Sequence, residues 1–296
     1  MGERDVVRRR APEPIDLHTH SSVSDGTQAP AELVAAARRA GLGTIALTDH
    51  DTTAGWEEAR AAAARLHVAV VGGIELSTGY EGRSVHMLGY LVDPENPGLV
   101  AETARIRASR LARARRIVAL IGRDYDFTWA DVLAHVRSGA TVGRPHIADA
   151  LVARGYVPDR SAAFAGILRA GRGYTLPHYA PDVVTGVRLI RAAGGVPVLA
   201  HPATGAGRLV VPEDELGTLV EAGLFGLEVE HRLNTADGKR LLRRLAVRHG
   251  LVATGSSDYH GAGKPNLLGE NRTPAGVLDA IVREATGSEP FLPASL

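Results

Sequence analysis

Short apolar runs alternate along the chain with longer stretches in which apolar residues recur every three or four positions. The runs have the length of strands, and the longer stretches have the period of helices that pack one face against a sheet. We predict strands at residues 15–18, 44–48, 68–74, 85–91, 196–200, 225–229 and 251–254. Helices are predicted at residues 30–41, 54–66, 183–193, 214–222, 235–249 and 274–285. This alternation is typical of a parallel sheet with helical crossovers.

The alternation is interrupted between residues 93 and 181, where the chain is rich in Arg and Ala and has a helical pattern without a clear apolar strand. Seven strands with helical crossovers around such a segment predict an α/β fold, in which a closed barrel carries an inserted helical cap. We therefore expect an N-terminal tail at residues 1–14, a barrel domain at residues 15–92 and 182–296, and a cap domain at residues 93–181.

Composition limits the chemistry that this fold can support. The 296 residues include no cysteine, which excludes disulfides, thiolate nucleophiles and Cys-ligated metal sites. The balance of 34 basic and 33 acidic residues gives no overall attraction to nucleic acid or membrane. The tail has no apolar stretch of a secretory signal, and no apolar run has the length of about 18 residues that a membrane span needs. We expect the cytoplasm as the location and no obligate protein partner.

Imidazole and carboxylate side chains recur at the ends of the predicted strands. The carboxyl ends of the strands of a (β/α) barrel meet at one face, where active sites lie. A lone buried histidine is usually a hydrogen-bonded core residue, but unrelated core histidines have no reason to fall repeatedly at strand ends. The pattern therefore predicts a metal centre with nitrogen and oxygen ligands. The nine expected ligands are His18, His20, Asp25, His50, Glu75, His86, His201, Asp258 and His260.

These positions fall in motifs that resemble those of the PHP (polymerase and histidinol phosphatase) family. The motifs are Asp16-x-His18-x-His20, Thr48-Asp49-His50-Asp51, Gly73-x-Glu75, the lone His86, Ala200-His201-Pro202 and Ser257-Asp258-x-His260-Gly261. The similarity covers the chain apart from its tail and is greatest to stand-alone bacterial members that dephosphorylate nucleotides or trim RNA 5′ ends. It implies a distorted seven-stranded (β/α)7 barrel and a site for three divalent ions.

The resemblance also implies how the ligands divide among the ions. The first ion would be held by His18, His20, Glu75 and Asp258. Glu75 would bridge to a second ion held by His86 and His201, and the third would take Asp25, His50 and His260. Mixed nitrogen and carboxylate ligands suit Mn²⁺, Zn²⁺ or Fe²⁺ better than Mg²⁺, and of these we expect Mn²⁺. No protein nucleophile is needed, because bound ions lower the pKa of water toward about 7.

Other residues near these motifs have less certain roles at the level of sequence. Asp16 and Asp51 flank the ligands, and they either orient imidazoles or cap turns. Arg144 and His146 stand at the start of a cap helix, where they could bind a phosphate or simply form a helix entry. Lys264 is a weaker substrate-binding candidate.

The segment from Arg105 to Arg116 holds six arginines that spread around a helix, which favours a solvated helix over a polynucleotide track. Five further histidines match no ligand motif and are interpreted as structural, with His178 and His231 the least secure because they could lie near the rim of the site.

These observations predict a metal-dependent phosphoric ester hydrolase. The expected substrate is a nucleotide, as a nucleoside bisphosphate or monophosphate, with 5′–3′ trimming of short single-stranded RNA as an extension. One alternative is a histidinol-phosphate phosphatase, which the same motifs would serve. Another is a metal-stabilised binding domain without turnover. An amidohydrolase-like enzyme is disfavoured, because His86 stands where a bridging lysine would be needed.

Overall fold

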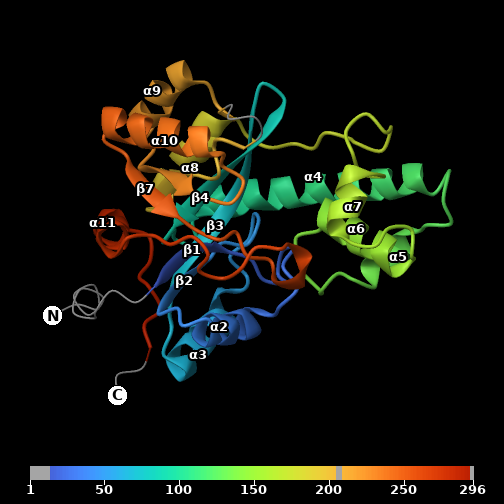
Figure 1. Ribbon diagram of the computed structural model, residues 1–296, viewed down its shortest axis with the longest axis horizontal. Helices are drawn as coiled ribbons and strands as arrows, with labels where there is room; N and C mark the ends of the chain where they lie inside the picture. Colours follow the sequence, from blue (N-terminus) through green and yellow to red (C-terminus); the bar gives the residue numbers. More distant parts are fainter. Residues whose placement is uncertain (1–13, 205–208, 294–296) are drawn as a thin grey trace.

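The computed structural model describes residues 14–204 and 209–293, so nearly all of the predicted N-terminal tail lies outside the described residues. Seven strands form one sheet in chain order, and Figure 1 shows them at the centre of the larger part of the molecule. The strands are β1 (Ile15–Thr19), β2 (Thr44–Leu47), β3 (Ala69–Tyr80), β4 (Arg83–Tyr90), β5 (Val196–Leu199), β6 (Gly226–Glu230) and β7 (Val252–Gly255). A parallel bridge between Thr19 and Tyr259 links the two ends of the sheet and nearly closes the barrel.

The sheet is not uniformly parallel, which corrects the prediction for one strand. β4 pairs antiparallel with both β3 and β5, whereas the other neighbours are parallel. β3 also continues six residues past its predicted end at Ile74, because it forms a hairpin with β4. The turn of this hairpin is Glu81-Gly82, with φ of 46° and 75°, a pair of positive values that two-residue hairpin loops favour.

Helices cover the outside of the barrel. They are α2 (Pro30–Arg39), α3 (Trp56–Leu66), α8 (Val183–Ala192), α9 (Glu213–Glu221), α10 (Ala236–His249) and α11 (Ala275–Glu284). All of them except α11 pack their apolar faces on one large buried cluster that includes Leu33, Ile45 and Val187. A second cluster joins strand residues such as Leu17 and Tyr90 to α11. The prediction of a distorted seven-stranded barrel is confirmed.

The inserted segment is helical, as predicted. It contains α4 (Pro97–Ile121), α5 (Trp129–Leu133), α6 (Arg144–Ala153) and α7 (Arg160–Ala165). α4 extends from the barrel into a separate lobe, where α5, α6 and α7 pack beside its far end (Figure 1). This lobe has its own buried apolar cluster, which includes Ile117, Phe127 and Leu151. In the described part of the chain, no helix combines the length and the apolar character needed to cross a membrane.

Candidate metal centre

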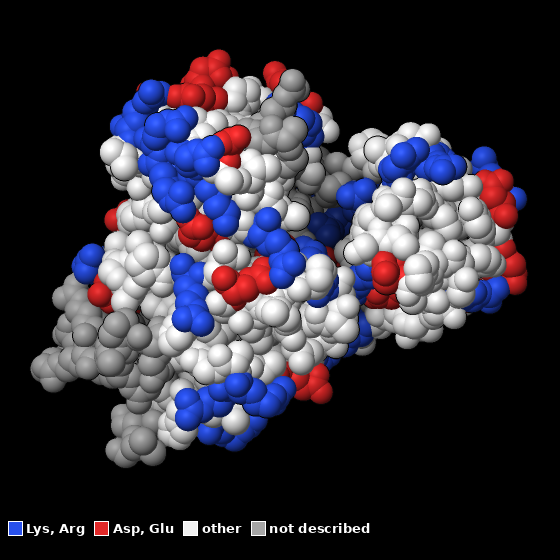
Figure 2. All heavy atoms as spheres, in the orientation of Figure 1, with Lys and Arg blue, Asp and Glu red and all other residues white. Residues whose placement is uncertain are grey.

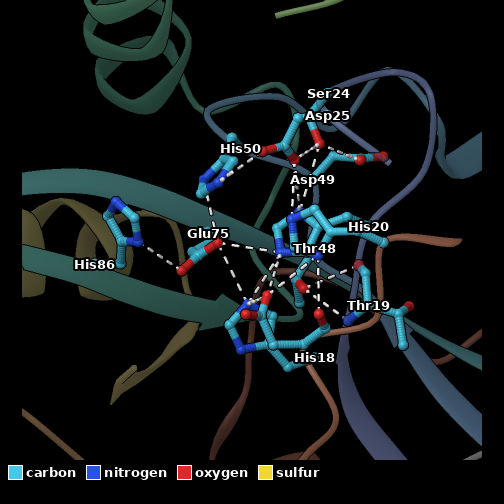
Figure 3. A network of polar contacts seen from close by, with 12 residues as sticks. His18, Thr19, His20, Ser24, Asp25, Thr48, Asp49, His50, Glu75 and His86 are labelled. Atoms are coloured by element: carbon cyan, nitrogen blue, oxygen red, sulfur yellow. Dashed lines mark hydrogen bonds and ion pairs between the residues drawn. The ribbon is translucent and has the colours of Figure 1, made fainter. Parts of the chain in front are cut away.

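The nine expected ligands converge at one end of the barrel, and Figure 3 shows several of them pointing toward one another. His18 lies at the end of β1, and His50 follows β2 directly. Glu75 lies within β3, and His201 follows β5. β4 carries His86 near its beginning, opposite Ser77 of β3. Because β4 runs opposite to its neighbours, its beginning lies at the edge where the parallel strands end.

Glu75 stands at the centre of the cluster and contacts five histidines. Its Oε2 lies 3.3 Å from His18 Nε2, 3.1 Å from His20 Nε2 and 3.1 Å from His50 Nδ1. Its Oε1 lies 2.9 Å from His86 Nδ1 and 3.2 Å from His201 Nε2. The two oxygens of one carboxylate therefore face two different sets of imidazoles, which is the geometry that a carboxylate bridging two ions requires.

Among the described residues, three overlapping groups of ligand atoms lie close enough together that each could hold an ion. The groups are His18, His20, Glu75 and Asp258; His50, Glu75 and His86; and His20, Asp25, His50 and His260. Within each group the ligand atoms lie within 4.8 Å of one another. The first group has the predicted membership. The second contains His50 in place of His201. His201 lies outside the three groups, with its Nε2 3.2 Å from Glu75 Oε1 and its ring beside those of His18 and His86. The third contains His20 in addition to the predicted residues.

The donor set and its surroundings fit divalent cations. Nitrogen and carboxylate oxygen atoms of mostly buried side chains face each other. His50 Nδ1 lies 3.1 Å from Glu75 Oε2 and His260 Nε2 lies 3.1 Å from Asp25 Oδ1, and neither nitrogen makes a hydrogen bond of good geometry among the described residues. Burial opposes charge on the carboxylates, but the imidazoles around them hold the pKa of Asp25 and Glu75 well below the usual range. Burial lowers the pKa of His260 to about 4, so this ring is neutral near pH 7 and its Nε2 can donate electrons to a metal.

Three further buried aspartates hold the loops that carry the ligands. Asp16 accepts hydrogen bonds from the backbone N–H groups of Ser257 at 2.9 Å and Gly269 at 2.8 Å. Asp49 accepts from the N–H and hydroxyl of Ser21 at 2.8 and 2.6 Å. Asp51 accepts from Ser77 in the same way, at 2.7 and 2.8 Å. Of the two readings of Asp16 and Asp51, the structure favours the one in which they fix turns, since neither contacts an imidazole.

Two further buried residues lie near the ligands: Glu228, which the sequence analysis did not single out, and His231, which it interpreted as structural but as one of the two least secure cases. Glu228 of β6 lies 2.9 Å from His18 Nδ1 and accepts the backbone N–H of His201 at 2.7 Å. His231 is fully buried, with its Nε2 3.5 Å from Asp258 Oδ2. The sequence did contain a signal for Glu228, because a charged residue stands in the middle of the otherwise apolar run Leu227-Glu228-Val229.

The three substrate-binding candidates lie at different places. Lys264 donates to Asp258 Oδ2 at 2.7 Å, and the carboxylates of Asp258 and Asp25 raise its pKa although burial opposes this. Arg144 begins α6 and lines a cavity beside the hairpin of β3 and β4. His146 is buried, accepts the N–H of Gly143 at 3.2 Å and lines a different cavity.

α4 is not a uniformly solvated helix. Arg107, Arg110 and Arg113 are spaced three residues apart and share one face, from which the first two reach Asp51 of the barrel and Arg113 reaches His178 of the inserted segment. Arg107 donates to the backbone oxygen of Asp51 at 2.6 Å, and the buried Arg110 donates to the Asp51 carboxylate at 3.2 Å and to Ser77 Oγ at 2.9 Å. The interpretation of this arginine segment as solvated is therefore wrong for these three residues.

The chain is similar to phosphoesterases over most of its length. The PHP domain family matches residues 16–138. A 3′,5′-nucleoside bisphosphate phosphatase of Chromobacterium violaceum is 36% identical over 260 residues, which are 84% of this chain and 88% of that protein. A 5′-3′ exoribonuclease of Haemophilus influenzae is 33% identical over 257 residues, with 83% and 89% covered. A solved structure from Bifidobacterium adolescentis, assigned as a metal-dependent phosphoesterase, matches with a TM-score of 0.90 and 41% identity over 93% of this chain and 98% of that one.

The barrel, the cluster of ligand-type residues and these relatives define the class of the protein, a metal-dependent phosphoesterase and hence a hydrolase. Within that class, the chain belongs to the PHP family.

Proposed function

We propose that the chain hydrolyses a phosphate monoester of a nucleotide, and that its preferred substrate carries a second phosphate, as a nucleoside bisphosphate does. The observation that supports this most directly is a pocket beside the proposed metal centre that contains Arg113 and Arg144, two arginines without an acidic partner among the described residues. The name of the Chromobacterium relative points to the same substrate class.

The metal part of the proposal uses all nine expected ligands and three ions, with Mn²⁺ preferred and Zn²⁺ or Fe²⁺ as alternatives. His18, His20, Glu75 and Asp258 would hold one ion, Glu75 would share a second with His86 and His201, and Asp25, His50 and His260 would hold a third. When bound, such ions supply positive charge to the phosphate and lower the pKa of water. The chain itself holds the ligands, through Asp16, Asp49 and Asp51, and orients the substrate.

The second phosphate would lie in a cavity of about 580 Å³ between the β3–β4 hairpin, α4 and the start of α6. Its lining includes Arg113, Arg144 and His178. Ser84 also lines it and contacts Nε2 of the proposed ligand His86 at 3.4 Å, so the cavity adjoins the proposed metal centre. Figure 2 shows basic side chains within the hollow between the barrel and the helical lobe.

Arg113 and Arg144 form no ion pair with a carboxylate among the described residues, whereas Arg83, which also lines the cavity, pairs with Glu81. Arg113 donates to His178 Nδ1 at 2.8 Å, and because a guanidinium only donates, that nitrogen is an acceptor and the His178 proton is on Nε2. Arg113 Nε and His178 Nε2 are buried without a hydrogen-bond partner in the described part of the chain. The two carboxylates in the lining are engaged elsewhere, since Glu81 pairs with Arg83 and Asp182 caps α8. These donors are suited to an anion.

The same charges disfavour histidinol phosphate, the alternative substrate. Histidinol phosphate has one phosphate and carries an ammonium group, which Arg113 and Arg144 would repel if it lay in the cavity. RNA with a 5′ phosphate stays as an extension of the proposal, because its first phosphodiester is also an anion. The non-catalytic alternative is disfavoured by relatives of matching length that are enzymes. We further propose that residues 93–181 act as a cap, because α4 and α6 supply the two arginines.

The proposal is tested by phosphate release from Mn²⁺-loaded protein with adenosine 3′,5′-bisphosphate, AMP, histidinol phosphate and a 5′-phosphorylated RNA. We expect the bisphosphate to have the highest kcat/KM. The Arg113→Met variant should lose about tenfold to 100-fold in kcat/KM for the bisphosphate, and much less for AMP. His50→Ala should abolish release from all substrates, whereas His249→Ala on α10 serves as the matched control. Equal kcat/KM for AMP and bisphosphate in the wild type would refute the second subsite.

A further inference from the structure

The carboxylate of Glu228 joins two of the proposed ligands from behind. It is fully buried, and each of its oxygens has a separate partner. Oε1 lies 2.9 Å from His18 Nδ1, and Oε2 accepts the backbone N–H of His201 at 2.7 Å. The neighbouring Leu227 and Val229 belong to the cluster under the outer helices, so Glu228 points the other way, to the metal centre.

The contact with His18 determines which ring nitrogen faces the cluster. A carboxylate oxygen accepts, so the His18 proton lies on Nδ1 and Nε2 keeps its lone pair. That Nε2 lies 3.3 Å from Glu75 Oε2 and 3.6 Å from Asp258 Oδ1, which is where the first ion would be. Carboxylates that hold a ligand histidine in this way fix its tautomer and raise its basicity as a ligand.

The contact with His201 supports a strained backbone. His201 has a φ of 30°, a positive value that residues other than glycine rarely adopt and that requires support from the surroundings. The bond from its N–H to Glu228 supplies such support. The same turn is held by Asn234, whose Oδ1 accepts the N–H of Ala203 at 3.0 Å and whose Nδ2 donates to the backbone oxygen of Glu228 at 2.9 Å.

We infer that Glu228 is a positioning residue for two ion sites, in that one carboxylate sets the His18 tautomer and holds the His201 turn. The inference rests on the proposed ligand set and is independent of which phosphate ester is the substrate. The inferred role distinguishes the third ion from the other two, because Glu228 makes no contact with its proposed ligands Asp25, His50 and His260. Loss of the Glu228 carboxylate should therefore weaken the two ions that share His18 and His201, and spare the third.

The Glu228→Gln variant tests this inference with little change in size. A glutamine offers one acceptor where two donors are present, so its NH₂ faces either His201 N–H or His18 Nδ1. In the second case His18 must place its proton on Nε2, where it blocks metal binding. We expect the number of tightly bound Mn²⁺ or Zn²⁺ ions per chain to fall from three to one, and the affinity for the other two to drop about tenfold to 100-fold.

Bound metal is measured by elemental analysis after gel filtration, and affinity by competition with a chelator. Glu230→Gln is the matched control, since Glu230 lies on the same strand, is partly exposed and pairs with Lys239 at 3.2 Å and with Arg243. Its metal content should stay at the wild-type value.

A purely structural role for Glu228 would lower the melting temperature of the metal-free protein and leave the metal-induced rise in melting temperature unchanged. The inferred role reduces that rise. Glu228→Asp, which keeps the charge but is shorter, should lose an intermediate amount of bound metal. This variant provides the test if the glutamine variant does not fold. Wild-type metal content and affinity in both variants would overturn the inference. Because no substrate is used, its failure is distinct from failure of the proposed nucleotide hydrolysis.

Discussion

At the scale of single residues, the candidate metal centre includes strained backbone. Asp51, His201 and Asp258 have φ of 55°, 30° and 54°, although none of them is glycine. Each such residue costs roughly 1–3 kcal/mol and persists only where surrounding contacts hold it in place. Asp51 has Ser77 and Arg110 as partners, and His201 has Glu228. These hydrogen bonds therefore stabilise the turns from which the ligand side chains point to one place.

His178 gives a prediction about pH at this scale. Burial, followed by the charges of Arg113 and Arg110, lowers the pKa of His178 to about 3, whereas an unfolded histidine has a pKa of about 6.5. Between these values the unfolded chain takes up a proton that the folded chain rejects. The stability that His178 contributes is therefore complete above about pH 6.5 and falls as the pH is lowered toward 3.

The check is to compare the wild type with His178→Asn by urea unfolding of metal-free protein at pH 7 and pH 4. The free energy of unfolding of the wild type should fall by about 1 kcal/mol more than that of the variant, a modest value because the ring is partly exposed to solvent. Titration of the metal ligands is common to both proteins and cancels. If the difference in free energy of unfolding between the wild type and His178→Asn were the same at pH 7 and pH 4, His178 would not be held neutral in the folded chain.

At the scale of elements, the hydrophobic pattern predicted the seven strands because each is a short apolar run bounded by turn residues. The pattern carries no information on direction, so it could not show that residues 83–90 return antiparallel as part of a hairpin. Despite this reversal, His86 lies at the edge of the sheet where the parallel strands end. Helix periodicity also could not assign the arginines of α4, because the face that becomes buried is decided by where the barrel lies.

Arg110 links α4 to the barrel, and its removal gives a prediction about this packing. Its side chain is 7% exposed and faces the fully buried carboxylate of Asp51. Arg110→Met keeps most of the apolar stem but leaves that carboxylate without its cation, which should cost about 3 kcal/mol. Arg116→Met, at an exposed position of the same helix, should change stability by less than about 0.5 kcal/mol.

Denaturant unfolding measures both variants, and Arg110→Met should also lower kcat, because the Asp51 loop carries His50. A double variant with Asp51→Asn should recover part of the lost stability, since it removes the uncompensated charge. If Arg110→Met were as stable as Arg116→Met, the contact between α4 and Asp51 would have no energetic role.

At the scale of the whole molecule, the barrel gathers residues from His18 to His260 into one cluster, and the stability of that end of the barrel depends on its charge. Without cations, the ion-pair partners of the buried carboxylates of Asp25, Glu75 and Asp258 within the described residues are neighbouring imidazoles and Lys264. Ions that bind the folded chain and not the unfolded one stabilise it by mass action, by about 4 kcal/mol for a site saturated at a thousand times its Kd.

Removal of metal with a chelator should therefore lower the melting temperature by many degrees, and re-addition of Mn²⁺ should restore it. The rise on re-addition should be smaller in His260→Ala, which lacks one ligand of the third site, and unchanged in His249→Ala, whose histidine lies on α10 away from the cluster.

Differential scanning calorimetry at several Mn²⁺ concentrations measures this, because a ligand-linked transition shifts with ligand concentration whereas a transition without linkage does not. The helical lobe has its own apolar cluster and contributes none of the nine proposed ligands, so any second transition assigned to it should keep its temperature. Equal melting of the metal-free and loaded protein would show that these side chains do not form a metal centre.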